Sequence, residues 1–203
     1  MISILISSCS EDTQAQPPSP VAESLSLSYH DSLLLLFKNH PQYIADGFDY
    51  PVGKPNAKGY YNAQPFGKND YLGDDWNGVG GGNPDKGDPI FSMAHGYVTQ
   101  SINFYGGWGK VVRIVHPFPS GDSLQLVESL YAHMDDMFAR KGQWVHKGDT
   151  IGTIGTAEGI YLAHLHLEVR DQPNMDLGGG YSTVTRGYLD PTKFIKEHRT
   201  IVR

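Results

Sequence analysis

The stretch that decides the fold lies at residues 163–170 and reads Ala-His-Leu-His-Leu-Glu-Val-Arg. In an extended strand, successive side chains point to opposite faces, so His164 and His166 share one face while Leu165, Leu167 and Val169 share the other. Two imidazoles above an apolar layer make a poor core and a good pair of metal ligands. A surface strand can also carry two solvated histidines by chance, so the rest of the sequence has to decide between these interpretations.

Two upstream segments carry further candidate groups. Residues 71–78 read Tyr-Leu-Gly-Asp-Asp-Trp-Asn-Gly, and residues 131–134 read Tyr-Ala-His-Met. Together with residues 163–170 they resemble the lysostaphin/LytM-type zinc metallopeptidases, which cut peptides in bacterial cell walls. That family carries His-x-x-x-Asp, then Tyr-x-His-Leu/Met, then His-x-His followed by an apolar residue and Glu. The resemblance runs from about residue 48 to residue 194.

The resemblance implies an all-β or β-dominated fold: the antiparallel two-sheet LytM-like peptidase fold (a duplicated hybrid motif) with a short C-terminal helix. The composition agrees, since 24 glycines and 13 prolines are typical of short strands joined by many turns. A hairpin about His95-Gly96 is expected to join strands at 90–94 and 97–105. Asp190 and Pro191 are typical of the N-cap and first position of a last helix.

The strand expected at 124–134 also predicts where a groove lies. Its alternation places Val127, Tyr131 and His133 on one face and more apolar residues, such as Leu126 and Leu130, on the other. We therefore expect the groove on the face of His133. Glycine clusters at 78–82 and 178–180 are expected to be loops, and the resemblance adds that such loops wall the groove.

The resemblance implies a role for each candidate residue. Asp75 matches the carboxylate ligand of the zinc ion and His166 the second imidazole ligand. His164 and His133 match the two non-ligand histidines, which activate water and stabilise the oxyanion. One Zn²⁺ per chain is implied, held by about three protein ligands with one position open for water or substrate.

Tyr71 stands where the family has its first histidine ligand. A phenol with a pKa near 10 must lose its proton to ligate well, which at pH 7 costs about 4 kcal/mol before zinc compensates. Its oxygen also lies farther from the backbone than an imidazole nitrogen. Tyrosine can nevertheless coordinate zinc, and Asp70 offers a carboxylate next to it, although on the opposite strand face.

Three functions therefore remain open from the sequence. The first is a zinc endopeptidase of peptidoglycan, with Asp75 and His166 as ligands and Tyr71 or a water as the third. The second is a non-catalytic member of the same fold that binds peptidoglycan or a wall hydrolase, because relatives with degenerate metal sites activate amidases. The third is a structural envelope lipoprotein without a site.

The other six histidines are expected to be solvated or packed, and only His95 is a candidate replacement ligand. They are His30, His40, His95, His116, His146 and His198.

The N-terminal region predicts export. Residues 1–9 resemble the end of a bacterial lipoprotein signal in which Cys9 is acylated, although a chance cysteine is the plainer alternative. The apolar part is short and no Lys or Arg precedes Cys9, so an upstream start is expected. Residues 10–47 are expected to form a disordered tether and a short helix, and residues 48–203 the peptidase domain. These expectations place the protein in the cell envelope or periplasm.

Charge and cysteine content exclude several functions. The net charge is −6 and no basic run is longer than two residues, so nucleic acid is an unsuitable partner. No stretch approaches the ~20 apolar residues that span a membrane, so membrane attachment would depend on Cys9 alone. A single cysteine also excludes an intramolecular disulfide and a zinc site made of thiolates. Peptidoglycan peptides remain the expected partner, with another wall hydrolase as the alternative.

Overall fold

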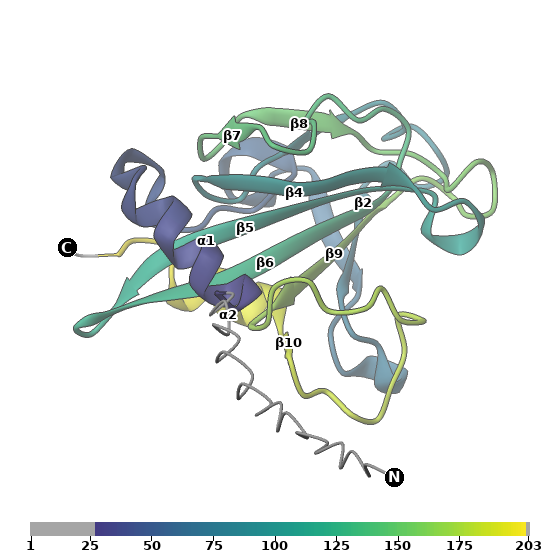
Figure 1. Ribbon diagram of the computed structural model, residues 1–203. Coiled ribbons are helices and arrows are strands. Elements are labelled where there is room, and N and C mark those ends of the chain that lie inside the picture. Colours follow the sequence, from purple (N-terminus) through teal and green to yellow (C-terminus); the bar gives the residue numbers. More distant parts are fainter. Residues whose placement is uncertain (1–26, 202–203) are drawn as a thin grey trace, which may run out of the picture.

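The computed structural model describes residues 27–201 (Figure 1). The expected lipoprotein signal with Cys9, and the tether up to residue 26, lie outside the described residues. The strands are β1 (Tyr60–Gln64), β2 (Asp74–Gly78), β3 (Pro89–Phe91), β4 (Gly96–Asn103), β5 (Lys110–Ser120), β6 (Ser123–Met134), β7 (Trp144–Val145), β8 (Thr150–Thr153), β9 (Leu165–Arg170) and β10 (Tyr188–Leu189). The helices are α1 (Tyr29–Lys38) and α2 (Pro191–Glu197), with short helical turns η1 (Pro41–Tyr43), η2 (Gly53–Ala57), η3 (Lys68–Asp70) and η4 (Gly106–Trp108).

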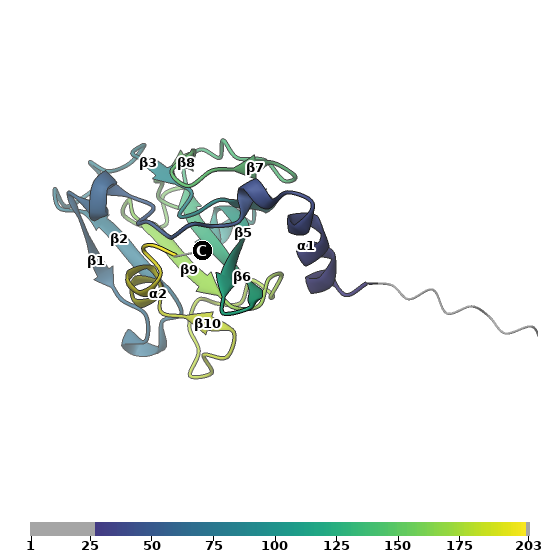
Figure 2. The ribbon, with the colours of Figure 1, turned by 90° about the vertical axis from the view of Figure 1, so that its left-hand side faces the viewer.

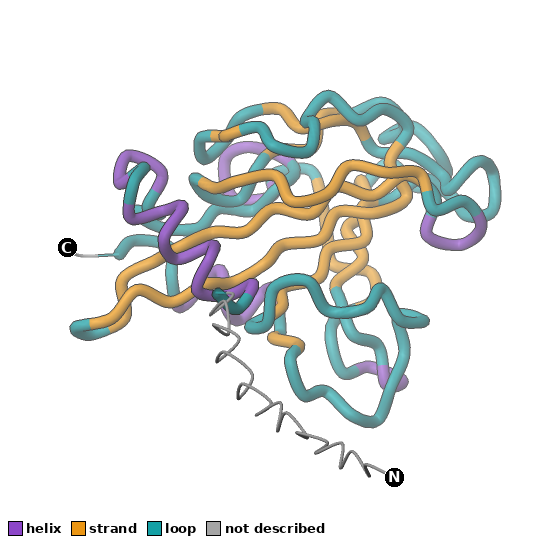
Figure 3. The backbone as a smooth tube through the Cα atoms, in the orientation of Figure 1, coloured by secondary structure: helices purple, strands orange, loops and turns teal. Residues whose placement is uncertain are grey.

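The strands form two antiparallel sheets, which dominate the molecule (Figure 3). The large sheet has the order β1-β2-β9-β6-β5-β4-β7, with β10 also paired to β9, and the small sheet pairs β3 with β8. Ile90 and Ile151 of the small sheet and Val98 and Leu165 of the large sheet belong to one fully buried cluster, so the core lies between the sheets. The expected β-dominated two-sheet fold with a C-terminal helix is confirmed.

One expected strand pairing was wrong. Residues 90–94 and 97–105 do not form a hairpin about His95-Gly96, because β3 takes its hydrogen-bond partners from β8 and β4 takes its partners from β5 and β7. The segment between β3 and β4 instead carries the chain from the small sheet to the large one. Gly96 begins β4 in close contact with β5, where a Cβ atom would lie 2.5 Å from the Val115 carbonyl oxygen.

The two faces of the large sheet are covered by different helices (Figure 2). On the core face, α2 buries Phe194 and Ile195 in the main cluster. On the opposite face, which we call the outer face, α1 buries Leu33 and Phe37 against β5 and β6. The short helix expected within residues 10–47 is thus α1, and its N-cap is Ser28. No helix within residues 27–201 is long and apolar enough to cross a bilayer.

Capping explains where α2 begins. The Asp190 carboxylate accepts a hydrogen bond from the Lys193 backbone N–H at 2.8 Å, and Pro191 occupies the first helical turn. An aspartate N-cap satisfies one of the backbone donors that a helix leaves unpaired at its start. The sequence prediction for this helix start is confirmed.

Candidate functional site

Three neighbouring strands bring the candidate residues together. β9 lies between β2 and β6, and His166 of β9 is paired with Asp75 on one side and with Ala132 on the other. Paired residues of adjacent strands share a face, so Asp75 and His166 lie side by side on the outer face. His164 precedes β9 on that face, while Leu165, Leu167 and Val169 are fully buried in the core, in agreement with the alternation of the sequence.

His133 reaches this site by a route that the strand pattern did not predict. The face shared by Val127 and Tyr131 is buried in the core, so the groove does not lie where we expected it. His133 instead has a φ of 61°, in the left-handed region, at a bulge of β6 opposite residues 110–112. This bulge interrupts the alternation and turns the imidazole to the outer face, beside His164 and His166.

The Tyr71 hydroxyl lies between the two candidate ligands. Its oxygen is 2.5 Å from Asp75 Oδ1 and 2.6 Å from His166 Nδ1. Asp75 Oδ1 and His166 Nδ1 are themselves 3.2 Å apart, and His164 Nε2 is 3.7 Å from the same carboxylate oxygen. The four side chains therefore form one hydrogen-bonded and ion-paired cluster.

A glycine allows Tyr71 and Asp75 to come this close to β9. A Cβ atom on Gly73 would lie 2.6 Å from the Leu167 carbonyl oxygen and 2.7 Å from His166 Cε1. Both distances are shorter than van der Waals contact, so any larger residue would push the chain away from His166.

The protonation states of the cluster follow from burial and charge. Burial lowers the pKa of His166, but its hydrogen bonds to Asp75 and Glu168 outweigh this and raise the pKa to about 9. Burial would raise the pKa of Asp75, but the hydrogen bond and charge of His166 lower it. Burial first, and then the Asp75 charge, raise the pKa of Tyr71, so the phenol keeps its proton. His166 Nδ1–H then donates to Tyr71 Oη, whose O–H donates to Asp75 Oδ1.

Glu168 and Arg170 extend the cluster along β9, and the sequence prediction missed both as site residues. Glu168 Oε1 is 3.2 Å from His166 Nε2, and Glu168 Oε2 accepts from Arg170 Nε at 2.7 Å. Both side chains are fully buried. The signal was present, because positions 164, 166, 168 and 170 of one strand share a face.

His133 is buried without a full set of partners. Burial, followed by the nearby charges of His166 and His164, lowers its pKa to about 3, so the ring is neutral. Its Nδ1 atom has no hydrogen-bond partner in the part of the chain that the structure describes. His164 Nδ1, by contrast, donates to the Leu162 carbonyl at 2.8 Å. A ligand in the site can complete the hydrogen bonding of His133.

These side chains line a cavity of about 320 Å³, which we call the histidine cavity. Its aromatic walls come from Trp108, Tyr161 and Tyr181, and its glycines are Gly107, Gly179 and Gly180. Residues 179–180 thus form a wall, as the glycine cluster predicted, whereas residues 78–82 do not line the cavity. None of the described residues that line it is a lysine or an arginine.

One hydrogen bond joins two walls of the histidine cavity. The Trp108 indole N–H, from η4, donates to the Gly178 carbonyl oxygen at 3.0 Å. The indole ring also contacts the His166 imidazole at 5.3 Å between centroids. The two loops are therefore fixed relative to each other and to β9.

The residues present do not fit a zinc ion in this arrangement. Two ligands of a tetrahedral zinc lie about 3.3 Å apart, each ~2.1 Å from the metal, and the 3.2 Å between Asp75 Oδ1 and His166 Nδ1 fits that spacing. The Tyr71 oxygen, however, is much closer to both atoms than a third ligand would be. The Tyr71 hydroxyl forms a hydrogen bond with each of these two atoms. Both hydrogen bonds would have to break before the atoms could bind a metal. Accordingly, residues 27–201 contain no group of three or more His, Cys, Asp or Glu arranged to hold a metal ion.

The two alternative ligands considered from the sequence lie elsewhere. His95 Nδ1 accepts from the Lys147 backbone N–H at 3.1 Å, its Nε2 is 3.7 Å from Asp46, and it does not line the cavity. Asp70 is exposed and also outside the lining. Neither residue replaces the missing histidine.

Comparison with known proteins gives consistent matches. The model of the family described as Peptidase family M23 matches residues 75–177. The lipoprotein NlpD of Yersinia enterocolitica is 36% identical over 85 residues, which cover 42% of this chain and 79% of the relative. The NlpD/LppB homolog of Buchnera aphidicola is 28% identical over 141 residues, covering 70% and 36%, respectively. The cell division protein DipM of Caulobacter vibrioides is 28% identical over 90 residues, covering 44% of this chain and 14% of the relative.

Solved structures with a similar fold include two catalytic domains. A mutant of the catalytic domain of EnpA, a prophage-encoded M23 protein from Enterococcus faecalis, is 21% identical with a TM-score of 0.48, covering 71% of this chain and 95% of that one. The catalytic domain of the antimicrobial peptidase lysostaphin from Staphylococcus simulans is 18% identical with a TM-score of 0.45, covering 74% and 89%.

Proposed function

The chain belongs to peptidase family M23, and on that premise we propose that it is a non-catalytic member that binds peptidoglycan peptides in the bacterial cell envelope. The observation that carries the proposal is the Tyr71 hydroxyl, within 2.6 Å of both Asp75 Oδ1 and His166 Nδ1. The phenol takes up the two atoms that would otherwise hold a metal.

The charges of the cluster balance without a metal ion. The carboxylates of Asp75 and Glu168 flank His166, whose raised pKa keeps the imidazole protonated at neutral pH. The His166 imidazolium and the Arg170 guanidinium, which lies 2.5 Å from Glu168 Oε2, together supply the two positive charges that the carboxylates require. Zinc would have to displace its proton and move the Tyr71 phenol, which is 5% exposed.

The histidine cavity retains features that suit a peptide. Among residues 27–201, the buried Nδ1 atom of His133 has no partner, so it can hydrogen-bond one peptide group. Trp108, Tyr161 and Tyr181 offer aromatic surface for apolar parts of the ligand. A concave site with aromatic walls and a few polar groups is typical of binding sites for small ligands and peptides.

The location and partners of the proposal rest on the relatives. Two matched proteins are named as lipoproteins, NlpD and the Escherichia coli protein YgeR, and another is a cell division protein. This supports an exported protein of the envelope, anchored through Cys9. A wall hydrolase, such as an amidase, is the alternative partner for the same cavity.

A zinc endopeptidase is the second candidate, and one observation favours it. Asp75, His133, His164 and His166 all line one cavity. In that function Asp75 and His166 would be ligands, and His133 and His164 would be the catalytic histidines. Tyr71 would have to rotate away or act as the third ligand.

Zinc content and wall binding of the purified chain test the proposal together. We expect less than stoichiometric zinc after dialysis, co-sedimentation with peptidoglycan sacculi, and no zinc-dependent release of peptides from them. Tyr161→Ala should weaken sedimentation because Tyr161 lines the cavity, whereas Tyr105→Ala, an exposed tyrosine outside the lining, should not. Stoichiometric zinc with peptide release would establish the endopeptidase instead. Failure to sediment would leave the hydrolase as the partner.

A further inference from the structure

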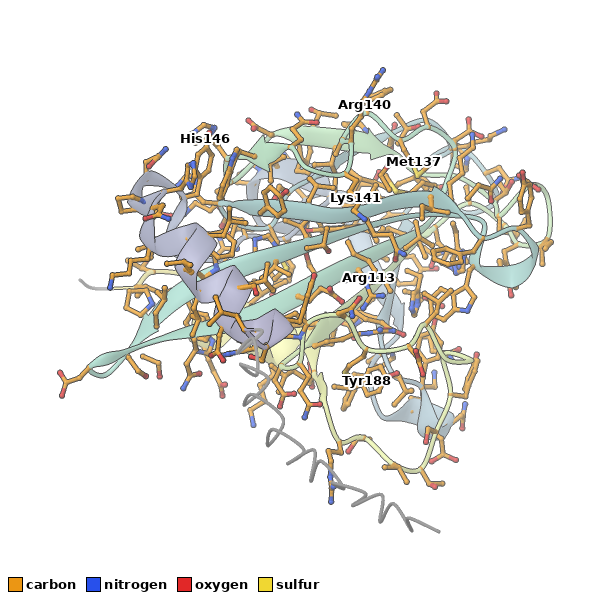
Figure 4. The ribbon with its side chains drawn as sticks, in the orientation of Figure 1. Arg113, Met137, Arg140, Lys141, His146 and Tyr188 are labelled. Atoms are coloured by element: carbon orange, nitrogen blue, oxygen red, sulfur yellow. The ribbon has the colours of Figure 1, made fainter. Side chains whose placement is uncertain are left out.

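A second cavity, of about 240 Å³, lies on the outer face of the large sheet beside α1, and we call it the α1 pocket. The residues of its lining that matter here are Tyr29, Tyr97, Arg113, Glu128, Lys141 and Asn174. Figure 4 labels Arg113 and Lys141, which both line this cavity. None of these residues lines the histidine cavity.

The floor of the α1 pocket is a buried ion pair in which both carboxylate oxygens of Glu128 already accept hydrogen bonds. Glu128 Oε1 accepts from Arg113 Nε at 2.8 Å and from Nη2 at 2.5 Å, and Glu128 Oε2 accepts from the Asn174 backbone N–H at 3.2 Å. Arg113 is not saturated in return. Within the described part of the chain, its Nη1 has one long contact, 3.5 Å, to Gln100 Oε1, so at least one guanidinium N–H lacks a close acceptor there.

Three further polar side chains of the pocket, Lys141, Tyr29 and Tyr97, can each donate a hydrogen bond. Within residues 27–201, neither the Lys141 ammonium nor the hydroxyls of Tyr29 and Tyr97 have a hydrogen-bond partner. Burial and the neighbouring Glu128 raise the pKa of Tyr29, so its phenol stays protonated and keeps its O–H to donate. Donors from α1, β4, β5 and the 140–143 turn therefore converge on one space.

We propose that the α1 pocket binds a carboxylate, with Lys141 and Arg113 Nη1 as the charged donors and the hydroxyls of Tyr29 and Tyr97 beside them. Charged donors make the strongest hydrogen bonds to carboxylates, and a guanidinium is suited to their planar geometry. The charged residues that line the pocket, Arg113, Lys141 and Glu128, sum to a positive charge, whereas the net charge of the chain is −6.

The charge balance selects a single negative charge. Glu128 compensates Arg113, so only the charge of Lys141 is left for the ligand. A doubly charged phosphate would leave one negative charge uncompensated next to the Glu128 carboxylate. The ligand class is therefore the end group of a peptide or a free carboxylic acid. This inference does not depend on the proposed function of the histidine cavity.

Titration of the full chain with matched small ligands tests this assignment by NMR. N-acetylalanine, which has a free carboxylate, should shift the amide signals of residues 97–100, 113, 141 and 174. N-acetylalanine amide, which differs only in lacking the charge, should not. Acetate should shift the same signals if a carboxylate alone is sufficient for binding. Binding of N-acetylalanine but not of acetate would assign the site to the ends of peptides.

Variants separate the pocket from nonspecific attraction. Lys141→Met should weaken N-acetylalanine binding about tenfold, the usual effect of losing a hydrogen bond to a charged group. Tyr97→Phe should weaken it less, and Lys58→Met, at an exposed lysine outside the lining, should leave it unchanged. Equal binding of the amide, tighter binding of inorganic phosphate, or an unaffected Lys141→Met variant would each overturn the assignment.

Discussion

At the scale of single residues, the proposed function rests on the position of the Tyr71 phenol. Tyr71 is 5% exposed, and its oxygen bridges Asp75 and His166. An imidazole at this position would reach less far into the cluster and would bring a neutral nitrogen that needs no deprotonation at neutral pH. The metal-binding state of the domain should therefore be reversible by one substitution.

Tyr71→His should restore zinc binding. We expect the affinity for zinc to rise by more than the ~10–100-fold that results from altering groups around metal ligands, because a direct ligand is regained. The affinity is measured by competition with a chromophoric chelator, and hydrolysis of sacculi is assayed in parallel. Asp75, His133, His164 and His166 are already in the cavity, so peptide release should accompany zinc.

Tyr71→Phe is the matched control, since it keeps the ring and removes the bridging oxygen. It should bind zinc more weakly than Tyr71→His. If the histidine variant bound zinc no better than the wild type, the position of the phenol would not be what excludes the metal.

At the scale of elements, β9 is the strand that holds the site together. On its outer face it carries His166, Glu168 and Arg170, and the Arg170 guanidinium donates to the carbonyl oxygens of Asp176 and Leu177, each at 3.0 Å. This strand therefore fixes both the central histidine and the start of the loop that reaches Gly178. Its charged residues are buried, so each depends on its partner.

Arg170→Met should destabilise the domain by about 3–5 kcal/mol, because it removes the guanidinium that pairs with the fully buried Glu168 and leaves the His166 imidazolium to balance both Glu168 and Asp75. Urea unfolding followed by far-UV circular dichroism measures the loss. The double variant Glu168→Gln/Arg170→Met should recover part of it, since the unpaired charge is then removed. A single variant within 1 kcal/mol of the wild type would contradict the pairing.

The start of α2 gives a smaller and independent effect. Asp190→Ala removes the oxygen that accepts from the Lys193 N–H and should reduce the free energy of unfolding by about 1 kcal/mol. Asp122→Ala, in the exposed turn between β5 and β6, serves as the control and should be neutral within 0.5 kcal/mol. Equal effects of the two substitutions would argue against the cap.

Local patterns could be predicted from the sequence, and distant pairings could not. The alternation of residues 163–170 and the Asp190-Pro191 helix start depend on neighbouring residues, so both were visible. The pairing of β3 with β8 joins segments about 60 residues apart, and nothing in either segment specifies it. The face of His133 was mispredicted because a bulge depends on the partner strand. Tyr71 was identified as the anomaly, but the position of its hydroxyl required the structure.

For the whole molecule, a buried histidine in the core should contribute to the acid sensitivity. His116 is fully buried, its Nδ1 donates to the His95 carbonyl at 2.9 Å, and its Nε2 is 2.7 Å from Ser129 Oγ. Burial lowers its pKa from 6.5 to about 4. Because the unfolded chain binds the proton more tightly, the stability from neutral His116 is complete above pH 6.5 and is lost as pH falls towards 4.

We expect this group alone to reduce the free energy of unfolding by about 2 kcal/mol between pH 7 and pH 5. His116→Gln should remove that contribution, so its stability should fall less steeply over this range even if it is lower at pH 7. Urea unfolding of both proteins at several pH values measures the slopes. Parallel curves would show that His116 does not titrate as described.

The backbone of His133 carries a further consequence for the energetics of the domain. For a residue with a side chain, the left-handed region costs about 1–2 kcal/mol of conformational free energy, and glycine adopts it without this cost. His133 has a φ of 61°, so the fold accepts a conformational penalty there in order to present an imidazole. His133→Gly should therefore be more stable than His133→Ala by about 1 kcal/mol in thermal unfolding, although both lack the ring. If both variants also lose sacculus binding, the imidazole of His133 is needed for the ligand. The backbone strain at this position would then lower the stability of the domain for the sake of binding.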